Sequence, residues 1–250
     1  MTSTSALEEL ASYVPALILR RMAADSGATL TPDSERFPAA VLMADLSGFT
    51  ALTERFAHAN PAGAEALTQI LDLYFGHLVG VVTAHGGDVV KFAGDGLLAL
   101  WYGDEPLAVL TRRAVQCGRA VQMMMMAPKA WGGFSEALQT AELRVRVGVG
   151  AGEIAAMHVG GIFGRWELLI VGDPLRQAGS AEALAQSGEV LIAPDAWPLV
   201  ADACIGTALP SGHARLDGLI ADLPLRALVL PPLIAPMADA LRAYIPRAVL

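Results

Sequence analysis

Residues 86–101 read Gly-Gly-Asp-Val-Val-Lys-Phe-Ala-Gly-Asp-Gly-Leu-Leu-Ala-Leu-Trp. Two short apolar runs flank a Gly-Asp-Gly turn, and β-branched and aromatic residues on either side of such a turn are typical of a β-hairpin. The hairpin would hold the carboxylate of Asp95 at its tip. Lys91 lies four residues earlier among apolar neighbours, where a charged side chain costs free energy unless some function uses it. We therefore expect this hairpin to carry part of a functional site.

A second carboxylate, Asp45, ends an apolar run that begins at Phe37 and is typical of a buried strand. A Gly-containing turn into a helix follows it. Carboxylate oxygen is a preferred ligand of Mg²⁺, and backbone amides at the start of a helix suit phosphate. The pattern predicts two-metal phosphoryl chemistry, with Asp45 and Asp95 bridging two Mg²⁺ ions and the backbone carbonyl of Leu46 completing one shell. The amides expected to hold a triphosphate are those of Ser47, Gly48, Phe49 and Thr50.

Composition narrows the class of protein. The chain has 250 residues and a formal net charge of −8, which argues against a nucleic-acid binder. Its two cysteines, Cys117 and Cys204, lack metal-ligand spacing and fit a reducing compartment. Hydrophobic residues make up 54% of the chain, yet no uninterrupted apolar run reaches the ~18 residues of a membrane span. We expect a cytoplasmic protein without a membrane span.

The residue patterns divide the chain into three parts: an N-terminal helix and linker (1–36), a domain (37–204), and an extension (205–250) leading towards a possible second domain. Within the domain the order strand, helix, two strands, helix, strand is typical of a ferredoxin-like α+β fold with a mostly antiparallel sheet. The expected elements are a strand over 37–45, a helix from 61 to about 85, the 88–101 hairpin, a helix over 105–127, antiparallel strands over 143–150 and 153–159, a strand over 166–171, a helix from 172 to about 186, and a last strand over 188–192.

One internal repeat bears on the organisation. Leu10–Leu19 and Leu241–Leu250 share Leu, Tyr, Pro and Leu at matching places. The first copy precedes the domain, so we interpret the second as the start of another, similar domain. Chance similarity of two helical segments is the alternative.

Two motifs together give a resemblance to a known family. Met43–Arg55 and Val90–Trp101 resemble the class III nucleotidyl cyclases, and most of all the first catalytic half of the soluble, bicarbonate-responsive adenylyl cyclases. The similar region is about 37–200. The resemblance implies conversion of ATP to 3′,5′-cyclic AMP and pyrophosphate, with Mg²⁺ (or Mn²⁺) on Asp45 and Asp95. It also implies that Arg146 contacts the triphosphate, whereas a strand Arg that only reaches towards solvent is the alternative.

The chain departs from the family where relatives complete the site. A base-reading Thr or Asp, a ribose-orienting Asn and a phosphate-stabilising Arg correspond here to Leu169, Arg176 and Ser180. Leu cannot hydrogen-bond a base, and losing the Arg removes a charge aimed at the transition state. The residues expected to hold the metal ions are therefore present, whereas the base-reading, ribose-orienting and phosphate-stabilising residues are not. We expect a second cyclase domain, in the same chain or as a dimer partner, to supply them.

Lys91 matches the Lys that reads the adenine edge in homodimeric members of the family. Lys91 and Arg176 also correspond roughly to the cations that bind the activating anion in bicarbonate-responsive relatives, with Arg176 out of register by a few residues. A bicarbonate-like site is one interpretation, and cations facing solvent or paired with Glu167 or Asp173 are the other. For the whole chain, the alternatives to a catalytic half are a non-catalytic nucleotide- or anion-binding regulatory module and a weakly active homodimer.

Overall fold

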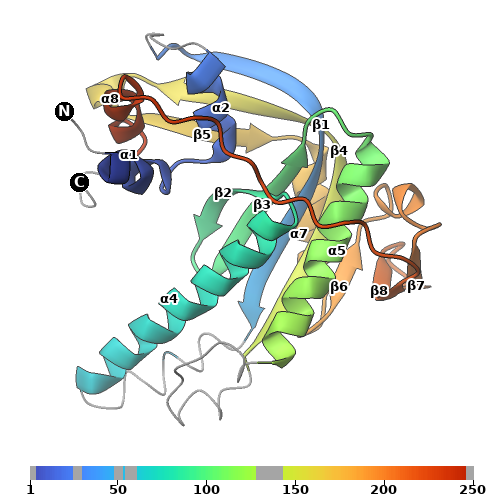
Figure 1. Cartoon of the computed structure of the whole chain (residues 1–250). Coiled ribbons are helices and arrows are strands. Elements are labelled where there is room, and N and C mark those ends of the chain that lie inside the picture. Colours follow the sequence, from blue (N-terminus) through green and yellow to red (C-terminus); the bar gives the residue numbers. More distant parts are fainter. Residues whose placement is uncertain (1–3, 25–29, 48–52, 54–60, 128–142, 246–250) are drawn as a thin grey trace.

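The computed structural model describes residues 4–24, 30–47, 53, 61–127 and 143–245, and a sheet of eight strands lies at its centre (Figure 1). The strand order is β2-β3-β1-β4-β6-β8-β7, with β5 paired to β4 outside this path. Every pairing is antiparallel except that of β4 with β6. This confirms the predicted α+β class and the mostly antiparallel sheet. The strands are β1 (Asp33–Ser47), β2 (Asp88–Ala93), β3 (Gly96–Tyr102), β4 (Arg144–Gly160), β5 (Trp166–Val171), β6 (Val190–Ile192), β7 (Cys204–Ala208) and β8 (Ala214–Leu219).

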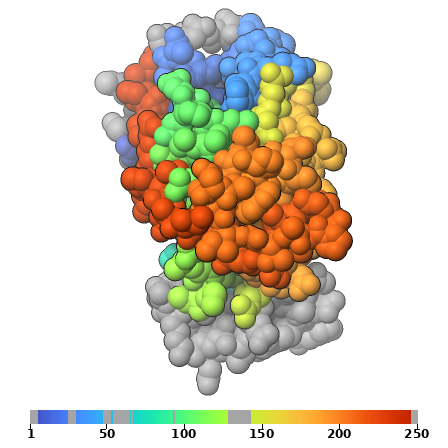
Figure 2. Space-filling view, turned by 90° about the vertical axis from the view of Figure 1, so that its right-hand side faces the viewer, coloured from blue at the N-terminus to red at the C-terminus, as the bar shows by residue number. Residues whose placement is uncertain are grey.

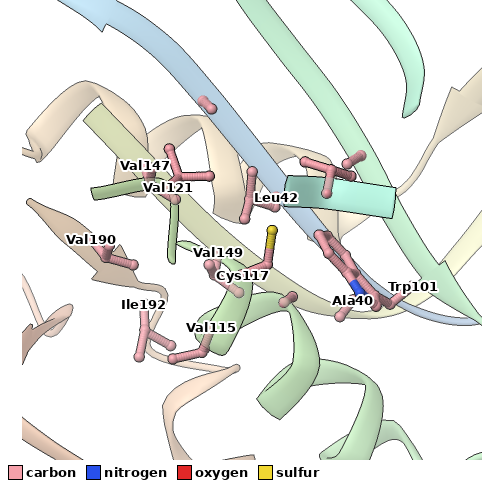
Figure 3. Close-up of a cluster of buried hydrophobic side chains, with 14 of the residues drawn as sticks. Ala40, Leu42, Trp101, Val115, Cys117, Val121, Val147, Val149, Val190 and Ile192 are labelled. Carbon is pink, nitrogen blue, oxygen red and sulfur yellow. The ribbon is translucent and has the colours of Figure 1, made fainter. Parts of the chain in front are cut away.

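The two faces of the sheet are covered by different helices. Alternate residues of β1 point to opposite sides, so Ala40 and Leu42 pack under α4 and α5, whereas Ala39 and Val41 pack under α7. The larger core lies on the α4/α5 side and includes Trp101, Cys117 and several valines (Figure 3). The helices are α1 (Thr4–Ala11), α2 (Ala16–Ala24), α4 (Pro61–Ala84), α5 (Leu107–Met126), α7 (Asp173–Leu184) and α8 (Met237–Arg242).

Strand β4 corrects one prediction. The segments 143–150 and 153–159 do not fold back on each other; they form one strand of 17 residues that pairs with all of β1. An antiparallel pair of these two segments would need a turn between them, but Gly152 takes a φ of +147° inside a continuous ladder. The glycines instead serve close packing, since a Cβ at Gly150 would lie 2.3 Å from the carbonyl oxygen of Pro174 in α7.

Regular structure continues into the extension that the sequence divided off at residue 205. Strands β7 and β8 form a hairpin on the sheet, so β6 is not the last strand. Residues 220–236, which we call the strap, then run across α5 to α8 (Figure 1). Side chains of α5 bind the strap's backbone: Arg112 donates to Ala221 O, and Gln116 exchanges two hydrogen bonds with Leu223. Figure 2 shows the strap (red) beside α5 (green) on one face.

Helices α1, α2 and α8 form a terminal helix cluster with a small core of its own. Both copies of the internal repeat contribute to it, through residues such as Ile18 and Leu241. The similarity of the two segments therefore coincides with direct packing between the two ends of the described chain. The inference of a second domain stays a prediction.

One buried carboxylate joins this cluster to the sheet. Asp88 at the start of β2 is only 2% exposed. The amides of Ala16 and Leu17, the first residues of α2, donate to its two oxygens at 2.8 Å each, and the hydroxyl of Tyr102 donates to Oδ2 at 2.8 Å. Asp88 thus caps a helix that lies more than 70 residues away in the sequence.

Candidate nucleotide and metal site

The register of three neighbouring strands brings the predicted site residues together. Asp45, near the end of β1, lies opposite Gly96 on one side and Arg146 on the other. Gly96 follows Asp95 directly, at the two-residue turn between β2 and β3, where Gly94 takes a φ of +64°. The two carboxylates and the guanidinium therefore share one edge of the sheet. The sequence predicted these three residues; the structure shows that they are neighbours.

Arg146 forms the centre of a charged cluster. Its guanidinium donates to Asp45 Oδ2, and its Nη2 atom lies 3.1 Å from Glu182 Oε1 on α7. The hydrogen bond to Asp45 and the charge of Glu182 raise the pKa of Arg146. Burial raises the pKa of Glu182, Arg146 opposes this effect, and Asp45 and Asp95 add to it. Arg146 thus pairs with two carboxylates and offsets only part of the negative charge that Asp45, Asp95 and Glu182 bring to this cluster. This arrangement confirms neither the triphosphate interpretation nor a purely solvent-directed side chain.

Several polar atoms around this cluster have no hydrogen-bond partner in the described part of the chain. They are buried Ser47 Oγ, Tyr74 Oη, Arg146 Nε and Glu182 Oε1, the last close to Arg146 but not aligned for a hydrogen bond. Burial and the nearby charges of Asp45 and Asp95 raise the pKa of Tyr74, so its hydroxyl stays protonated as a donor. Buried polar groups nearly always have hydrogen-bond partners, so these unpaired atoms are consistent with a polar ligand that binds at this edge of the sheet.

The donor set fits a hard divalent cation held jointly with phosphate. No group of three or more His, Cys, Asp or Glu side chains around one point occurs among the described residues, so protein carboxylates alone do not complete a cage. Mg²⁺ is commonly bound by one or two carboxylates together with substrate phosphates and water. Asp45 and Asp95 match that pattern. The backbone of Leu46, whose side chain is 2% exposed and packs in the core, is held next to them by pairing with Val145.

The other predicted site residues lie elsewhere or are not described. Gly48, Phe49 and Thr50 fall outside the described residues. Lys91 is exposed on β2 and makes no ion pair with any described residue. Arg176 on α7 pairs with Asp173 at 2.7 Å, with 71% of its side chain exposed. No hydrogen bond or ion pair among the described residues links Lys91 to the neighbours of Arg176, and the anion site stays a prediction.

The positions that depart from the family pattern lie on two elements. Leu169 is half-buried on β5 opposite Met157. Ser180 is on α7, where its Oγ lies 3.5 Å from Nε2 of the buried His213.

Sequence reasoning missed Glu182 and Tyr74. Glu182 interrupts a run of buried alanines at helical spacing, Ala178, Ala181 and Ala185, and an acid beside such a stripe is a usable signal. Tyr74 was missed because the hydroxyl of a Tyr on the apolar face of a helix gives no separate signal in the sequence.

The fold and this edge of the sheet define a class of protein. Residues 33–205 match the family described as the Adenylate and Guanylate cyclase catalytic domain, and the chain belongs to that family. Its likeness to adenylate cyclase type 10 of Oryctolagus cuniculus is 31% identity over 197 residues, covering 78% of this chain and 12% of that protein. The chain thus spans about an eighth of the length of this curated relative.

Solved structures agree with this assignment. The guanylyl cyclase Cya2 is 26% identical, with a TM-score of 0.62 over 78% of this chain and 99% of that one. The adenylyl cyclase CyaB from P. aeruginosa, at 22% identity and a TM-score of 0.60 over 78% of this chain and 100% of that one, shows the shared fold. The expected resemblance to class III cyclases is confirmed.

One described helix is long and apolar enough to be considered as a membrane span. Leu67–Ala84 of α4 has a mean hydropathy of 1.3, and 22% of this stretch is buried. Length and composition alone do not distinguish a span from a core helix. Every fourth residue along one side of this helix is buried: Ile70, Tyr74, Leu78 and Val82.

Proposed function

We propose that this chain is the metal-donating half of an adenylate cyclase, which converts ATP to 3′,5′-cyclic AMP and pyrophosphate in intracellular, cytoplasmic signalling. The observation that supports it most is the strand register that aligns Asp45, Asp95 and Arg146 at one edge. Two carboxylates suit divalent cations and a guanidinium suits the triphosphate. The similarity to adenylate cyclase type 10 supports ATP as the substrate.

In this proposal each residue has a defined task. Asp45 and Asp95, with the carbonyl of Leu46, would hold two Mg²⁺ ions, or Mn²⁺ in their place. When bound, such ions would supply activation of the ribose 3′-hydroxyl and balance of the triphosphate charge. Arg146 leaves Asp45 and binds triphosphate oxygens, while Glu182 keeps its guanidinium oriented. The buried hydroxyls of Ser47 and Tyr74 are available as further donors at the same edge.

The remaining groups come from a second cyclase domain, in the same chain or in a dimer partner. Leu169 offers no hydrogen bond to a base, and Ser180 carries no charge for the transition state. Arg176 is already paired with Asp173. A homodimer of this chain would lack these groups in both halves, so we expect its activity to be weak.

The test is cyclic AMP production from Mg-ATP by this chain alone and by any longer form that its gene encodes beyond Leu250. Activity in the longer form only, lost in Asp95→Asn but kept in the exposed control Asp217→Asn, supports the catalytic half. Strong activity of the 250-residue chain alone would show that Leu169, Arg176 and Ser180 do not disable it. Parallel assays with GTP decide between adenylyl and guanylyl specificity.

The second candidate function is a nucleotide- or bicarbonate-binding module without catalysis. The ion pair between Arg146 and Asp45, which occupies a metal ligand, favours it. ATP or bicarbonate binding in the absence of any cyclic nucleotide product, in both lengths of chain, would support this alternative. Loss of bicarbonate binding in Lys91→Ala would assign the anion site to the exposed cation on β2.

A further inference from the structure

A cavity of about 200 Å³ opens beside the strap, and none of the candidate site residues lines it. Its walls come from α2, the end of β3 with the loop that follows, the first turns of α5, and strap residues 226–229. Arg20, Arg113 and Arg226 contribute three guanidinium groups, against two carboxylates from Asp104 and Glu105. The lining therefore has a positive excess, in a chain whose formal net charge is −8.

Two of these arginines share one carboxylate. Arg113 has a side chain only 12% exposed and binds Glu105 through Nε and Nη2 at 2.8 and 2.9 Å, while its Nη1 donates to Pro224 O at 3.1 Å. This pairing lowers the pKa of Glu105. Arg226 approaches the same carboxylate with Nη1 alone, at 3.3 Å, so its remaining N–H groups are left for another acceptor.

Arg20 has no carboxylate partner among the described residues. Its Nη2 donates to the backbone oxygen of Val229 at 3.2 Å, and its guanidinium lies 5.3 Å from the centre of the Tyr102 ring. The charge of Arg20 acts on the nearby Asp88, but the oxygens of Asp88 already accept three hydrogen bonds, from two backbone amides and the Tyr102 hydroxyl. Arg20 and Arg226 thus bring unused donors to the cavity from two different segments of the chain.

We propose that this cavity binds a small oxyanion of phosphate chemistry, held by Arg20 and Arg226. Guanidinium groups pair with phosphate through parallel hydrogen bonds, and groups that arrive from two segments suit an anion whose oxygens point in several directions. Arg113 and Glu105 form the fixed floor of the site. The anion is either free phosphate or the phosphate of a nucleotide, and the site is separate from the proposed catalytic edge.

Binding at this cavity would fasten the strap to the rest of the domain. The strap is already seated closely here, because Leu228 N donates to Thr83 O at 2.7 Å and a Cβ on Gly86 would lie 2.7 Å from Arg226 O. An anion between Arg20 and Arg226 would add a further link between α2 and the strap. We therefore expect binding to stabilise the folded chain by an amount that grows with the logarithm of ligand concentration once that concentration exceeds the Kd.

The experiment titrates the 250-residue chain with inorganic phosphate by calorimetry, in EDTA so that no divalent ion contributes. Thermal unfolding and Trp fluorescence, with Trp101 lining the cavity, are read in parallel. Four variants are compared: Arg226→Gln, Arg20→Gln, Arg146→Gln at the candidate catalytic edge, and the control Arg242→Gln, whose residue lies on α8. Arg226 is 68% exposed, so its replacement leaves the fold intact even if Arg20→Gln unfolds.

We expect one phosphate per chain, about tenfold weaker binding in Arg226→Gln, and unchanged binding in Arg146→Gln and Arg242→Gln. A matching loss for ATP in Arg226→Gln would identify a nucleotide phosphate as the ligand, and loss for inorganic phosphate alone would identify the free anion. No binding at millimolar phosphate overturns the proposal. Loss of phosphate binding in Arg146→Gln with retention in Arg226→Gln also overturns it, because the anion would then occupy the catalytic edge.

Discussion

Replacing Asp88 by Ala should destabilise the whole domain, although Asp88 has no part in the proposed chemistry. The change removes the acceptor of three buried hydrogen bonds, two of them to the first amides of α2. Loss of a helix cap costs about 0.5–2 kcal/mol, and each buried donor left unsatisfied costs about 1–3 kcal/mol.

These costs are not additive, and one effect opposes them. Burial raises the pKa of Asp88, while the Ala16 and Leu17 amides and the Tyr102 hydroxyl lower it, so removing the carboxylate also recovers part of its desolvation free energy. We therefore expect a loss of about 2–4 kcal/mol in the free energy of unfolding. Asp88→Asn keeps one acceptor oxygen and should lose less.

The assay is urea unfolding followed by circular dichroism, with amide hydrogen exchange at Ala16 and Leu17 as the local measurement. The matched control is Asp239→Ala, since Asp239 is 96% exposed on α8 and should change stability by less than about 0.5 kcal/mol. If Asp88→Ala and Asp239→Ala unfold at the same urea concentration, and exchange at the α2 amides is unchanged, the capping argument is wrong.

Three further predictions concern other parts of the chain. Gly148→Ala should lower the free energy of unfolding in urea by about 1–3 kcal/mol, because its Cβ would lie 2.1 Å from the α7 backbone. Gly80→Ala in α4, with open space around it, should raise that free energy by up to about 1 kcal/mol. Equal effects of the two changes would contradict the close packing of β4 against α7. Burial and the charge of Arg21 lower the pKa of His158 below 6.5, so the folded chain favours the neutral ring. The free energy of unfolding should therefore fall as the pH drops below 6.5. His158→Phe should reduce this dependence on pH, measured by denaturation at several pH values. Glu182→Gln should weaken Mn²⁺ binding several-fold, or by about 1 kcal/mol, as measured by calorimetry. The reason is that Arg146 then has only the metal ligand Asp45 as an anionic partner and competes more strongly for it. Stronger Mn²⁺ binding in this variant would contradict the role given to Glu182.

Local chemistry made the hairpin and the helices predictable. The Gly-Asp-Gly turn and the apolar runs around it specify β2 and β3 within a few residues, and Pro61 marks the start of α4. Prediction failed where the structure of a segment depends on residues that are distant in the sequence. Gly152 resembles a turn residue, yet pairing with the long β1 keeps β4 extended through it. The strap has no periodicity, and side chains of α5 hold parts of its backbone, as Gln116 does at Leu223.

The residues of the candidate site likewise divide into those that the sequence could predict and those that it could not. Asp45 and Asp95 were predictable because an acid at the end of an apolar strand or at a hairpin tip is conspicuous. The pairing of Arg146 with Asp45 depends on register, which a single sequence does not specify. Glu182 reaches the cluster from α7 only because the helix lies close against the glycines of β4.

The length of β4 has a mechanical consequence. Arg146 lies near one end of this strand, and His158, near the other, stacks on Tyr244 beside the terminal helix cluster with ring centres 5.4 Å apart. Twelve residues of strand at roughly 3.3 Å each separate them by about 40 Å. Because β4 pairs with β1 along the whole length of β1, it cannot shorten without breaking those pairs. One continuous piece of hydrogen-bonded backbone therefore joins Arg146 to the terminal helix cluster.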